Sequence, residues 1–325
     1  MNSFSKQGRV DKKLLDNSAG LNVLCDMTLE KQVQKLKSDV ERNTELLNES
    51  EKFNKNITEF ISDISHELKT PLNVIFAAIQ VLDTYKNCRD KGSECIDKQN
   101  EYLKIMKENC YRLMKLINNL LDISKLDSGF IKLNCHNENI VNIVEDITLS
   151  LVPYVESKNI ELIFDTNVEE KIMAVDSDKM ERIILNLLSN AVKFTPPEGK
   201  IYVNVQCDYK NVYIVVKDTG VGIPEDKLKI IFERFGQAGN STLEENKGSG
   251  IGLYLAKSFA HLHGGQISVK SEKGSGSEFI VTLPVKTIEQ ENCTDKSNSI
   301  NNGEIACKSK MDQINMEFAD MYFKI

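Results

Sequence analysis

The sequence contains no tryptophan and no long apolar run. No stretch reaches the roughly 18 apolar residues of a membrane-spanning helix, and the N-terminus lacks the apolar core of a signal peptide. We therefore predict a cytoplasmic protein that does not itself insert into a membrane. A hydrophobic content of 41% with only 7% aromatic residues is typical of a protein that mixes helices with strands.

An excess of basic residues and a metal-binding cysteine pattern are also missing. There are 41 Lys and Arg residues against 48 Asp and Glu residues, which gives a net charge of −7. Nucleic-acid partners require a basic face, so none is predicted. The 8 cysteines never form Cys-x-x-Cys and are not grouped with histidines at zinc spacing. We predict reduced thiols in the cytosol.

Residues 65–72 read Ser-His-Glu-Leu-Lys-Thr-Pro-Leu, and an apolar stripe runs into and through this stretch. The stripe predicts a packed helix, because its members are spaced by 4, 3 and 4: Ile57, Ile61, Ile64 and Leu68. At about 100° per residue, His66 lies roughly 200° from Ile64 and Leu68, so its imidazole is expected to face solvent. Pro71 has no N–H for the carbonyl of Glu67, so the helix should bend or loosen there.

An exposed histidine beside a carboxylate is a plausible nucleophile. A neutral ring nitrogen of His66 can attack while Glu67 takes the proton from the other nitrogen. Thr70, four residues on, lies on the same exposed face. The alternative is a surface histidine without a chemical role.

This stretch resembles the H box of the sensor histidine kinases of two-component systems, with Lys69 in place of the commonest arginine. The resemblance implies that His66 is autophosphorylated and that Glu67 is its acid/base partner. It also implies that Thr70 orients water when the enzyme acts as a phosphatase on its response regulator.

Residues 28–85 form one long helical pattern. Polar residues occupy the positions of this register between Leu47 and Ile57. The apolar residues that set the register are spaced elsewhere by 3, 4 or 7: Val33, Leu36, Val40, Leu47, Ile57, Ile61, Ile64 and Leu68. We predict a parallel dimeric coiled coil over 28–56, the alternative being a merely solvated helix. The preceding residues 1–27 contain a short apolar strand before Asp26-Met27-Thr28, which resembles the end of a PAS sensor domain. A disordered leader is the alternative.

A second helix is expected from about residue 97 to 126, after a polar break at 86–98. Its stripe again has helical spacing: Leu103, Met106, Cys110, Leu113, Ile117 and Leu120. A two-helix hairpin cannot bury its apolar face alone, so a homodimer with a four-helix bundle is predicted over 57–128. Asp127, Ser128 and Gly129 should end the helix and form a hinge.

Residues 129–285 mix helix and strand patterns. Strands are predicted at 131–135, 160–165, 171–175, 201–208, 212–218, 265–271 and 277–284, and helices at 140–158, 177–193 and 253–263. Several strands alternate apolar and polar residues, so we predict a mostly antiparallel sheet covered on one face by helices, an α/β sandwich. The overall fold class is therefore α plus α/β.

Four motifs in this second part are suited to a nucleotide. Asn186, Asn190 and Lys193 share one helix face and offer hard oxygen ligands for Mg²⁺ and a cation for phosphate. Asp218 ends an apolar strand, where its carboxylate can accept from the exocyclic amine of adenine. The remaining motifs are Ile231-Phe232-Glu233-Arg234-Phe235 and Gly248-Ser249-Gly250-Ile251-Gly252-Leu253; the latter precedes a helix whose free amides suit phosphate. A Walker A loop and a Rossmann fingerprint are absent.

In this order the motifs resemble the N, G1, F and G2 boxes of the histidine-kinase ATP-binding domain, of the gyrase, Hsp90 and MutL superfamily. The resemblance implies ATP and Mg²⁺ as cofactors and a mobile lid at 236–249. The implied ATP-binding residues are Asn186, Asn190, Lys193, Asp218, Gly220, Gly222, Arg234, Gly248, Gly250, Gly252 and Leu253, with Asn190 as the Mg²⁺ ligand.

Residues 286–325 read as a tail. The part up to residue 303 is polar, and a short amphipathic helix follows with Met311, Ile314, Phe318, Met321 and Ile325 on one side. This helix could dock on the chain's own surface, dock on a partner, or stay frayed. No acidic cluster of a receiver domain follows, so the resemblance implies that the phosphoryl group passes to an aspartate on a separate response regulator. Two alternatives are an ATPase that does not phosphorylate itself and a degenerate kinase that only binds a regulator. The input signal and the cognate regulator are not specified by the sequence.

Overall fold

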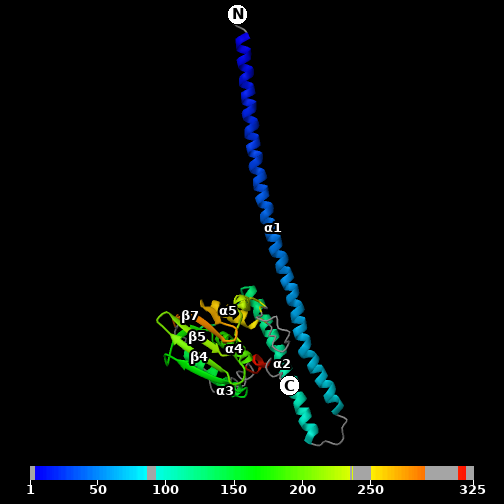
Figure 1. Cartoon of the computed structure of the whole chain (residues 1–325), viewed down its shortest axis with the longest axis vertical. Coiled ribbons are helices and arrows are strands. Elements are labelled where there is room, and N and C mark those ends of the chain that lie inside the picture. The colour runs from blue at the N-terminus through cyan, green and yellow to red at the C-terminus, as the bar shows by residue number, and fades with distance from the viewer. Residues whose placement is uncertain (1–3, 86–92, 235, 237–249, 290–313, 320–325) are drawn as a thin grey trace. The chain divides into compact units, whose positions relative to one another are not determined.

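The computed structural model describes residues 4–85, 93–234, 236, 250–289 and 314–319 (Figure 1). The chain divides into two units, residues 1–65 and residues 66–325. Among the described residues, no helix is both long and apolar enough to cross a membrane.

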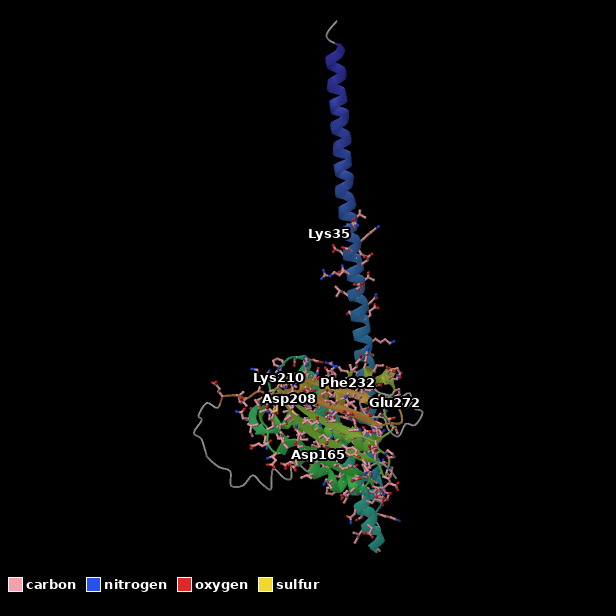
Figure 2. All side chains as sticks on the ribbon, turned by 60° about the vertical axis from the view of Figure 1, so that its left-hand side comes forward. Lys35, Asp165, Asp208, Lys210, Phe232 and Glu272 are labelled. Atoms are coloured by element: carbon pink, nitrogen blue, oxygen red, sulfur yellow. The ribbon has the colours of Figure 1, made fainter. Side chains whose placement is uncertain are left out.

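Helix α1 spans Phe4–Tyr85. The short strand predicted before Asp26 is wrong, because these residues continue the helix. Residues 4–65 are helical throughout, so the described part of this unit has no strand that could supply the ladder partner an isolated strand would need. From residue 33 to 48 every side chain is exposed, including the apolar seam of Val33, Leu36, Val40 and Leu47. Figure 2 shows these side chains projecting around Lys35.

The second unit begins with the end of α1 and helix α2, Ser93–Asp127. Helix α1 continues through Pro71 without interruption. Pro71 and Ala78 are buried, as expected for the inner face of a helical hairpin. Helix α2 starts four residues earlier than predicted. It ends as predicted: Gly129 adopts a φ of +67°, and Phe130 N–H donates to the carbonyl of Lys125 at 3.0 Å. A positive φ of this kind is typical of a glycine just beyond a helix.

The remaining residues form the predicted α/β sandwich. Its five-stranded sheet has the order β2-β4-β5-β7-β6, in which β2 and β4 are parallel and the other pairs antiparallel. The strands are β2 Glu161–Thr166, β4 Lys200–Cys207, β5 Asn211–Asp218, β6 Gln266–Ser271 and β7 Ser277–Pro284. Burial alternates along β4, β5 and β7, so one face of the sheet carries the core.

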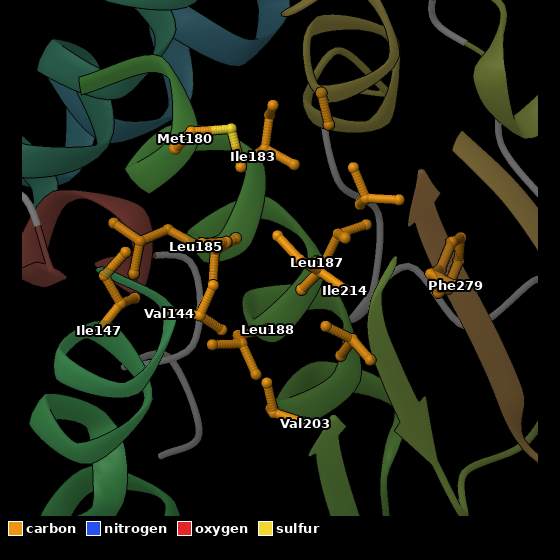
Figure 3. Packing of buried hydrophobic residues seen from close by; sticks show 14 of the residues in the cluster. Val144, Ile147, Met180, Ile183, Leu185, Leu187, Leu188, Val203, Ile214 and Phe279 are labelled. Atoms are coloured by element: carbon orange, nitrogen blue, oxygen red, sulfur yellow. The ribbon is translucent and has the colours of Figure 1, made fainter. Parts of the chain in front are cut away.

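Three helices cover that face: α3 Ile140–Glu156, α4 Ser177–Phe194 and α5 Gly252–Leu262 (Figure 1). Figure 3 shows Leu187 and Leu188 of α4 reaching toward Val203 and Ile214 of the sheet. Ten residues of α4 are buried, so this helix is the centre of the domain and fixes the side chains that it carries.

A small second sheet pairs β1, His136–Asn139, with β3, Ile172–Val175. The strand predicted at 131–135 is therefore wrong, and the strand lies just after it. The amide of Asn134 donates to the carboxylate of Asp176 at 2.9 Å instead of to a ladder partner. A side-chain acceptor thus takes the place of the backbone acceptor that a neighbouring strand would have supplied.

The tail contributes one helical turn to the same unit. Residues 314–319 are described, and Ile314, Phe318 and Ala319 are buried. Of the three possibilities for the tail helix, docking on the chain's own surface is the one observed. Met311, Met321 and Ile325 lie outside the described residues, as does most of the predicted lid.

Candidate functional site: a helical histidine and a nucleotide-type domain

His66 lies on α1 with its side chain exposed, as predicted. Glu67 follows it and is half-buried. The hydroxyl of Thr70 donates to the carbonyl of His66 at 3.1 Å, which ties this side chain to its own helix. The imidazole of His66 is therefore open to approach, beside a carboxylate and a hydroxyl.

Helix α4 carries Asn186, Asn190 and Lys193. The helix starts at a capped turn in which Asp176 accepts from the amide of Lys179 at 3.1 Å. Asn186 is only 5% exposed, and its side-chain amide donates to the carbonyl of Arg182 at 2.8 Å. Asn190, one turn on, is half-buried, so its amide oxygen is the more accessible of the two.

Asn186 also fixes the position of the next motif. A Cβ atom placed on Gly252 would collide with Oδ1 of Asn186, so the first residue of α5 packs directly on this side chain. Only glycine permits so close an approach of the two helices. Leu253 follows and packs on the hydrophobic core, which leaves the start of α5 beside the Asn186–Asn190 face.

Asp218 ends strand β5 and is 4% exposed. Its Oδ1 accepts from the amide of Gly220 at 2.8 Å and from the amide of Ser277 at 3.3 Å. Its Oδ2 accepts no hydrogen bond from the residues that the structure describes. One oxygen of Asp218 is thus held by the fold, and the other could accept a hydrogen bond from a ligand.

Burial raises the pKa of Asp218, while the hydrogen bonds from Gly220 and Ser277 act to lower it. Desolvation is the larger effect, because the carboxylate sits in a site with little access to water. A buried acceptor of this kind is costly unless a donor meets it. An amine of a planar base is such a donor, so the residues present fit the adenine of ATP.

The side chain of Arg234 is engaged by other residues of the chain. Its guanidinium makes a two-pronged ion pair with Asp127 at the end of α2, with Nη1 to Oδ2 at 2.8 Å. It also donates to the hydroxyl of Tyr254 at 2.8 Å and stacks on that ring, 4.9 Å from its centroid. The prediction that Arg234 contacts ATP remains untested, while its observed partners belong to α2 and α5.

Contacts between α2 and α4 are not among the sequence-based predictions. Arg182 forms an ion pair with Asp122 and donates to the side chain of Asn119 at 3.2 Å. A signal was available, because Arg182 precedes Asn186 by four residues and so shares its helix face. Asn119 and Asp122 are likewise one turn apart on α2.

The described residues contain no cluster of three His, Cys, Asp or Glu side chains that could hold a metal ion. A divalent cation at this site would need amide oxygens, water and phosphate oxygens as ligands. Mg²⁺ accepts that set, since it keeps several waters and binds through substrate phosphates. Asn190 fits this role better than the buried Asn186.

Comparison with known families agrees with both halves of this geometry. Residues 56–129 match the His Kinase A (phospho-acceptor) domain. Residues 175–287 match the Histidine kinase-, DNA gyrase B-, and HSP90-like ATPase family. A phospho-acceptor domain followed by this ATPase domain decides the assignment. The chain contains the two-domain core of the histidine kinases.

Two relatives illustrate the similarity to other histidine kinases. The chain is 35% identical over 253 residues to Hybrid signal transduction histidine kinase D of Dictyostelium discoideum, which covers 73% of this chain and 16% of the relative. It is 34% identical over 229 residues to the Circadian input-output histidine kinase CikA of Synechocystis, covering 70% of this chain and 30% of the relative. The matched part thus spans less than a third of either relative.

Solved structures of histidine kinases share the fold. Full-length ShkA in complex with AMPPNP matches with a TM-score of 0.53 and 25% identity, covering 70% of this chain and 45% of ShkA. Histidine kinase ThkA in complex with the response regulator protein TrrA matches with a TM-score of 0.51 and 20% identity, covering 70% of this chain and 61% of ThkA. The second likeness concerns the fold alone.

Proposed function

We propose that this chain is an ATP-dependent histidine kinase that phosphorylates itself on His66 and passes the phosphoryl group to an aspartate of a response regulator. The observation that carries the proposal is the exposed imidazole of His66 on a helical hairpin that leads directly into an ATPase-type domain. Neither part alone would require self-phosphorylation.

Several residues of the second domain are proposed to bind ATP. Asp218 accepts from the adenine amine through its unused oxygen, and Gly220 and Gly222 line the base. Asn190 would supply an oxygen to Mg²⁺, which would neutralise the phosphates, and Asn186, Lys193 and the glycine-rich stretch before α5 would face the triphosphate. Free amides at the start of α5 suit phosphate oxygens. Gly248 belongs to this set by sequence but lies outside the described residues.

The transfer step is an in-line displacement at the γ-phosphorus. A ring nitrogen of His66 forms a bond to phosphorus, and the bond from phosphorus to the bridging oxygen of ADP breaks. Glu67 takes the proton from the other ring nitrogen, and ADP leaves. Such a step depends mostly on positioning and on charge neutralisation. Movement at residues 127–129 brings the two domains together for it.

A homodimer is part of the proposal. Leu72, Phe76 and Ile79 on α1 are exposed apolar residues in the single chain. On α2, four exposed apolar residues fall within about 60° of one another at 100° per residue: Leu103, Met114, Ile117 and Leu121. Faces of this kind are buried when two hairpins form a four-helix bundle. The exposed seam of α1 between residues 33 and 48 would pair in the same dimer as a coiled coil.

The partner proposed for the phosphorylated His66 is the receiver domain of a response regulator. Thr70 lies one turn below His66, where its hydroxyl can exchange its helical hydrogen bond for a water molecule. That arrangement supports a second, phosphatase activity toward the regulator. The proposed divisions are a signalling helix at 28–56, a dimerisation and phosphotransfer domain at 57–128, and the ATP-binding domain at 129–285.

The test is incubation of the purified chain with γ-labelled ATP and Mg²⁺. The wild type is compared with His66→Gln, Asn190→Ala and the control His261→Gln, which changes another exposed histidine. We expect acid-labile, alkali-stable label on the wild type and on His261→Gln, and none on the other two. Phosphohistidine is lost in acid, whereas phosphoserine is not.

Other results would contradict the proposal in different ways. Label that persists in His66→Gln would place the acceptor elsewhere. ATP hydrolysis without any protein-bound label would identify an ATPase that does not phosphorylate itself. Mg·ATP binding with neither label nor hydrolysis would identify a degenerate kinase.

A further inference from the structure

Residues 314–319, here called the tail turn, contact two elements at once. On α2, Nζ of Lys115 donates to the carbonyl of Glu317 at 2.7 Å, and the amide of Asn118 lies 3.3 Å from Sδ of Met316. On α3, the ring of Tyr154 meets the ring of Phe318 edge-on, with centroids 5.0 Å apart. The turn is drawn in red beside α2 and α3 in Figure 1 and beside Ile147 in Figure 3.

The apolar side of the tail turn is part of the hydrophobic core. Phe318 is 0% exposed and Ile314 is 7% exposed, and both belong to the cluster that contains Ile123 of α2 and Leu151 of α3. The amide of Phe318 donates to the carbonyl of Ile314 at 2.9 Å, so one helical turn presents both side chains on the same side. Burial this complete is unusual for a segment that is only loosely held.

The polar side of the tail turn completes a charge arrangement. The carboxylate of Glu317 lies 3.1 Å from Nζ of Lys115, and both side chains are 14% exposed. Burial lowers the pKa of Arg182, and the charge of Glu317 acts to raise it again. Arg182 in turn pairs with Asp122 of α2. Two cations and two carboxylates therefore balance where α2, α4 and the tail turn meet.

Chain connectivity does not force this placement. The 24 positions from 290 to 313 separate the tail turn from the ATP-binding domain. Fully extended, such a segment reaches about 80 Å. The tail turn could lie almost anywhere on the surface, so its position is determined by the contacts that it makes.

We propose that α2 and α3 together form a binding site for an amphipathic helical turn, which the chain fills with its own residues 314–319, and that this docking restrains the ATP-binding domain against α2. Lys115 and Asn118 precede residues 127–129, and Tyr154 follows them. Rotation about residues 127–129 therefore has to separate Lys115 from Glu317 or Tyr154 from Phe318. Docking and release of the tail turn would thus set how freely that movement occurs.

The test compares two tail-releasing variants with two matched controls. Phe318→Ala and a chain ending at Lys310 remove the apolar anchor. Asn315→Ala, at a half-buried position of the same turn, and a chain ending at Ala319 leave it in place. Docking is read by hydrogen exchange in residues 115–123 and 147–156, and freedom at the hinge by chymotrypsin cleavage after the exposed Phe130.

We expect exchange in both segments to rise about tenfold in the two releasing variants and to stay unchanged in the controls. Cleavage after Phe130 should accelerate by a similar factor. Equal exchange in all chains would overturn the docking. Faster exchange without faster cleavage would overturn the restraint.

A further consequence rests on the proposed kinase function. Because the transfer step needs movement at residues 127–129, the initial rate of self-phosphorylation should rise severalfold in both releasing variants. A lower rate would contradict a restraining role. Absence of label from every chain, with exchange and cleavage still changed, would overturn the kinase function and leave the docking and the restraint standing.

Discussion

At the scale of single residues, Asp218 is where structure and chemistry meet most closely. The fold uses one of its oxygens for two backbone amides and buries the group almost completely. A carboxylate in this setting destabilises the apo domain, because part of its hydration is lost. Such a cost at a ligand site is expected when the ligand later supplies the missing donor.

Replacing Asp218 by Asn should separate ligand binding from folding. The amide oxygen of Asn would accept from the two backbone amides, which turns its NH₂ group toward the adenine amine. Both groups are donors, so the hydrogen bond to adenine would be lost. Loss of one hydrogen bond to a charged group costs about 1.5–3 kcal/mol, so ATP should bind roughly tenfold to a hundredfold more weakly. Calorimetric titration with Mg·ATP measures this, and unchanged affinity would remove Asp218 from the site.

The same variant should change how stability depends on pH. In the folded protein the pKa of Asp218 is raised above its usual 3.8, so the folded state keeps this proton to a higher pH than the unfolded state. The free energy of unfolding should therefore fall as pH rises from about 3.8 to the raised pKa, and remain lower above it.

Asp218→Asn should lack this decline. Urea denaturation between pH 4 and pH 7 should show the variant gaining stability relative to the wild type as pH rises. A constant difference across that range would contradict the assignment. The two measurements are independent, since the denaturation series contains no nucleotide.

At the scale of elements, α4 and α5 form the rigid base of the site. Asn186 stands between them, bound to its own helix on one side and touching Gly252 on the other. The position of the α5 start, and of the phosphates proposed to bind there, depends on this contact. Asn186 thus has a structural role whether or not it also meets the nucleotide.

Gly252→Ala should destabilise the domain, because the added Cβ collides with Oδ1 of Asn186. Overpacking of this kind costs about 1–3 kcal/mol. In the double variant Asn186→Ala/Gly252→Ala the colliding atom is gone, so the loss should be smaller than the sum of the single losses by about 1 kcal/mol. Thermal denaturation without nucleotide checks both statements, and strict additivity would show that the contact is not what requires glycine.

At the scale of the whole molecule, the apolar faces left exposed on α1 and α2 have to be accounted for. Phe76 is 61% exposed, while Ala78, two residues on, is 3% exposed. Helix α1 therefore has one apolar side covered within the chain and another that is not. Exposed apolar groups aligned in this way mark an interface.

Phe76→Glu should convert the proposed dimer into a monomer, because a carboxylate would be buried at the bundle seam without a partner. Ala77→Glu is the matched control. It adds the same group at an exposed position about 100° further round the helix, on the side of His66 and Thr70. Light scattering after size exclusion should show a dimer for the wild type and the control. A dimer that survives Phe76→Glu would place the interface elsewhere.

Much of this organisation could be predicted from local sequence. The helical stripes, the alternating strands, the glycine that ends α2 and the exposure of His66 all follow from periodicities of 3.6 and 2 and from backbone preferences. Predictions failed where a local pattern competed with a distant group. Residues 131–135 look like a strand, but the amide of Asn134 is taken by Asp176, more than forty residues away. The apolar residues before Asp26 join a helix, since the described residues of that unit include no second strand to pair with them.

The sequence by itself determined the fold class, the order of the domains, the family and the residues in which the chemistry is expected, because each depends on spacing within one helix, strand or loop. The tertiary structure alone decided which side chains from different elements meet. It placed Arg234 on Asp127, Arg182 on Asp122, and Gly252 against Asn186. It also decided among three open possibilities for the tail by burying Phe318 beside Tyr154. Contacts between residues far apart in the chain depend on how whole elements pack, and no local pattern encodes that packing.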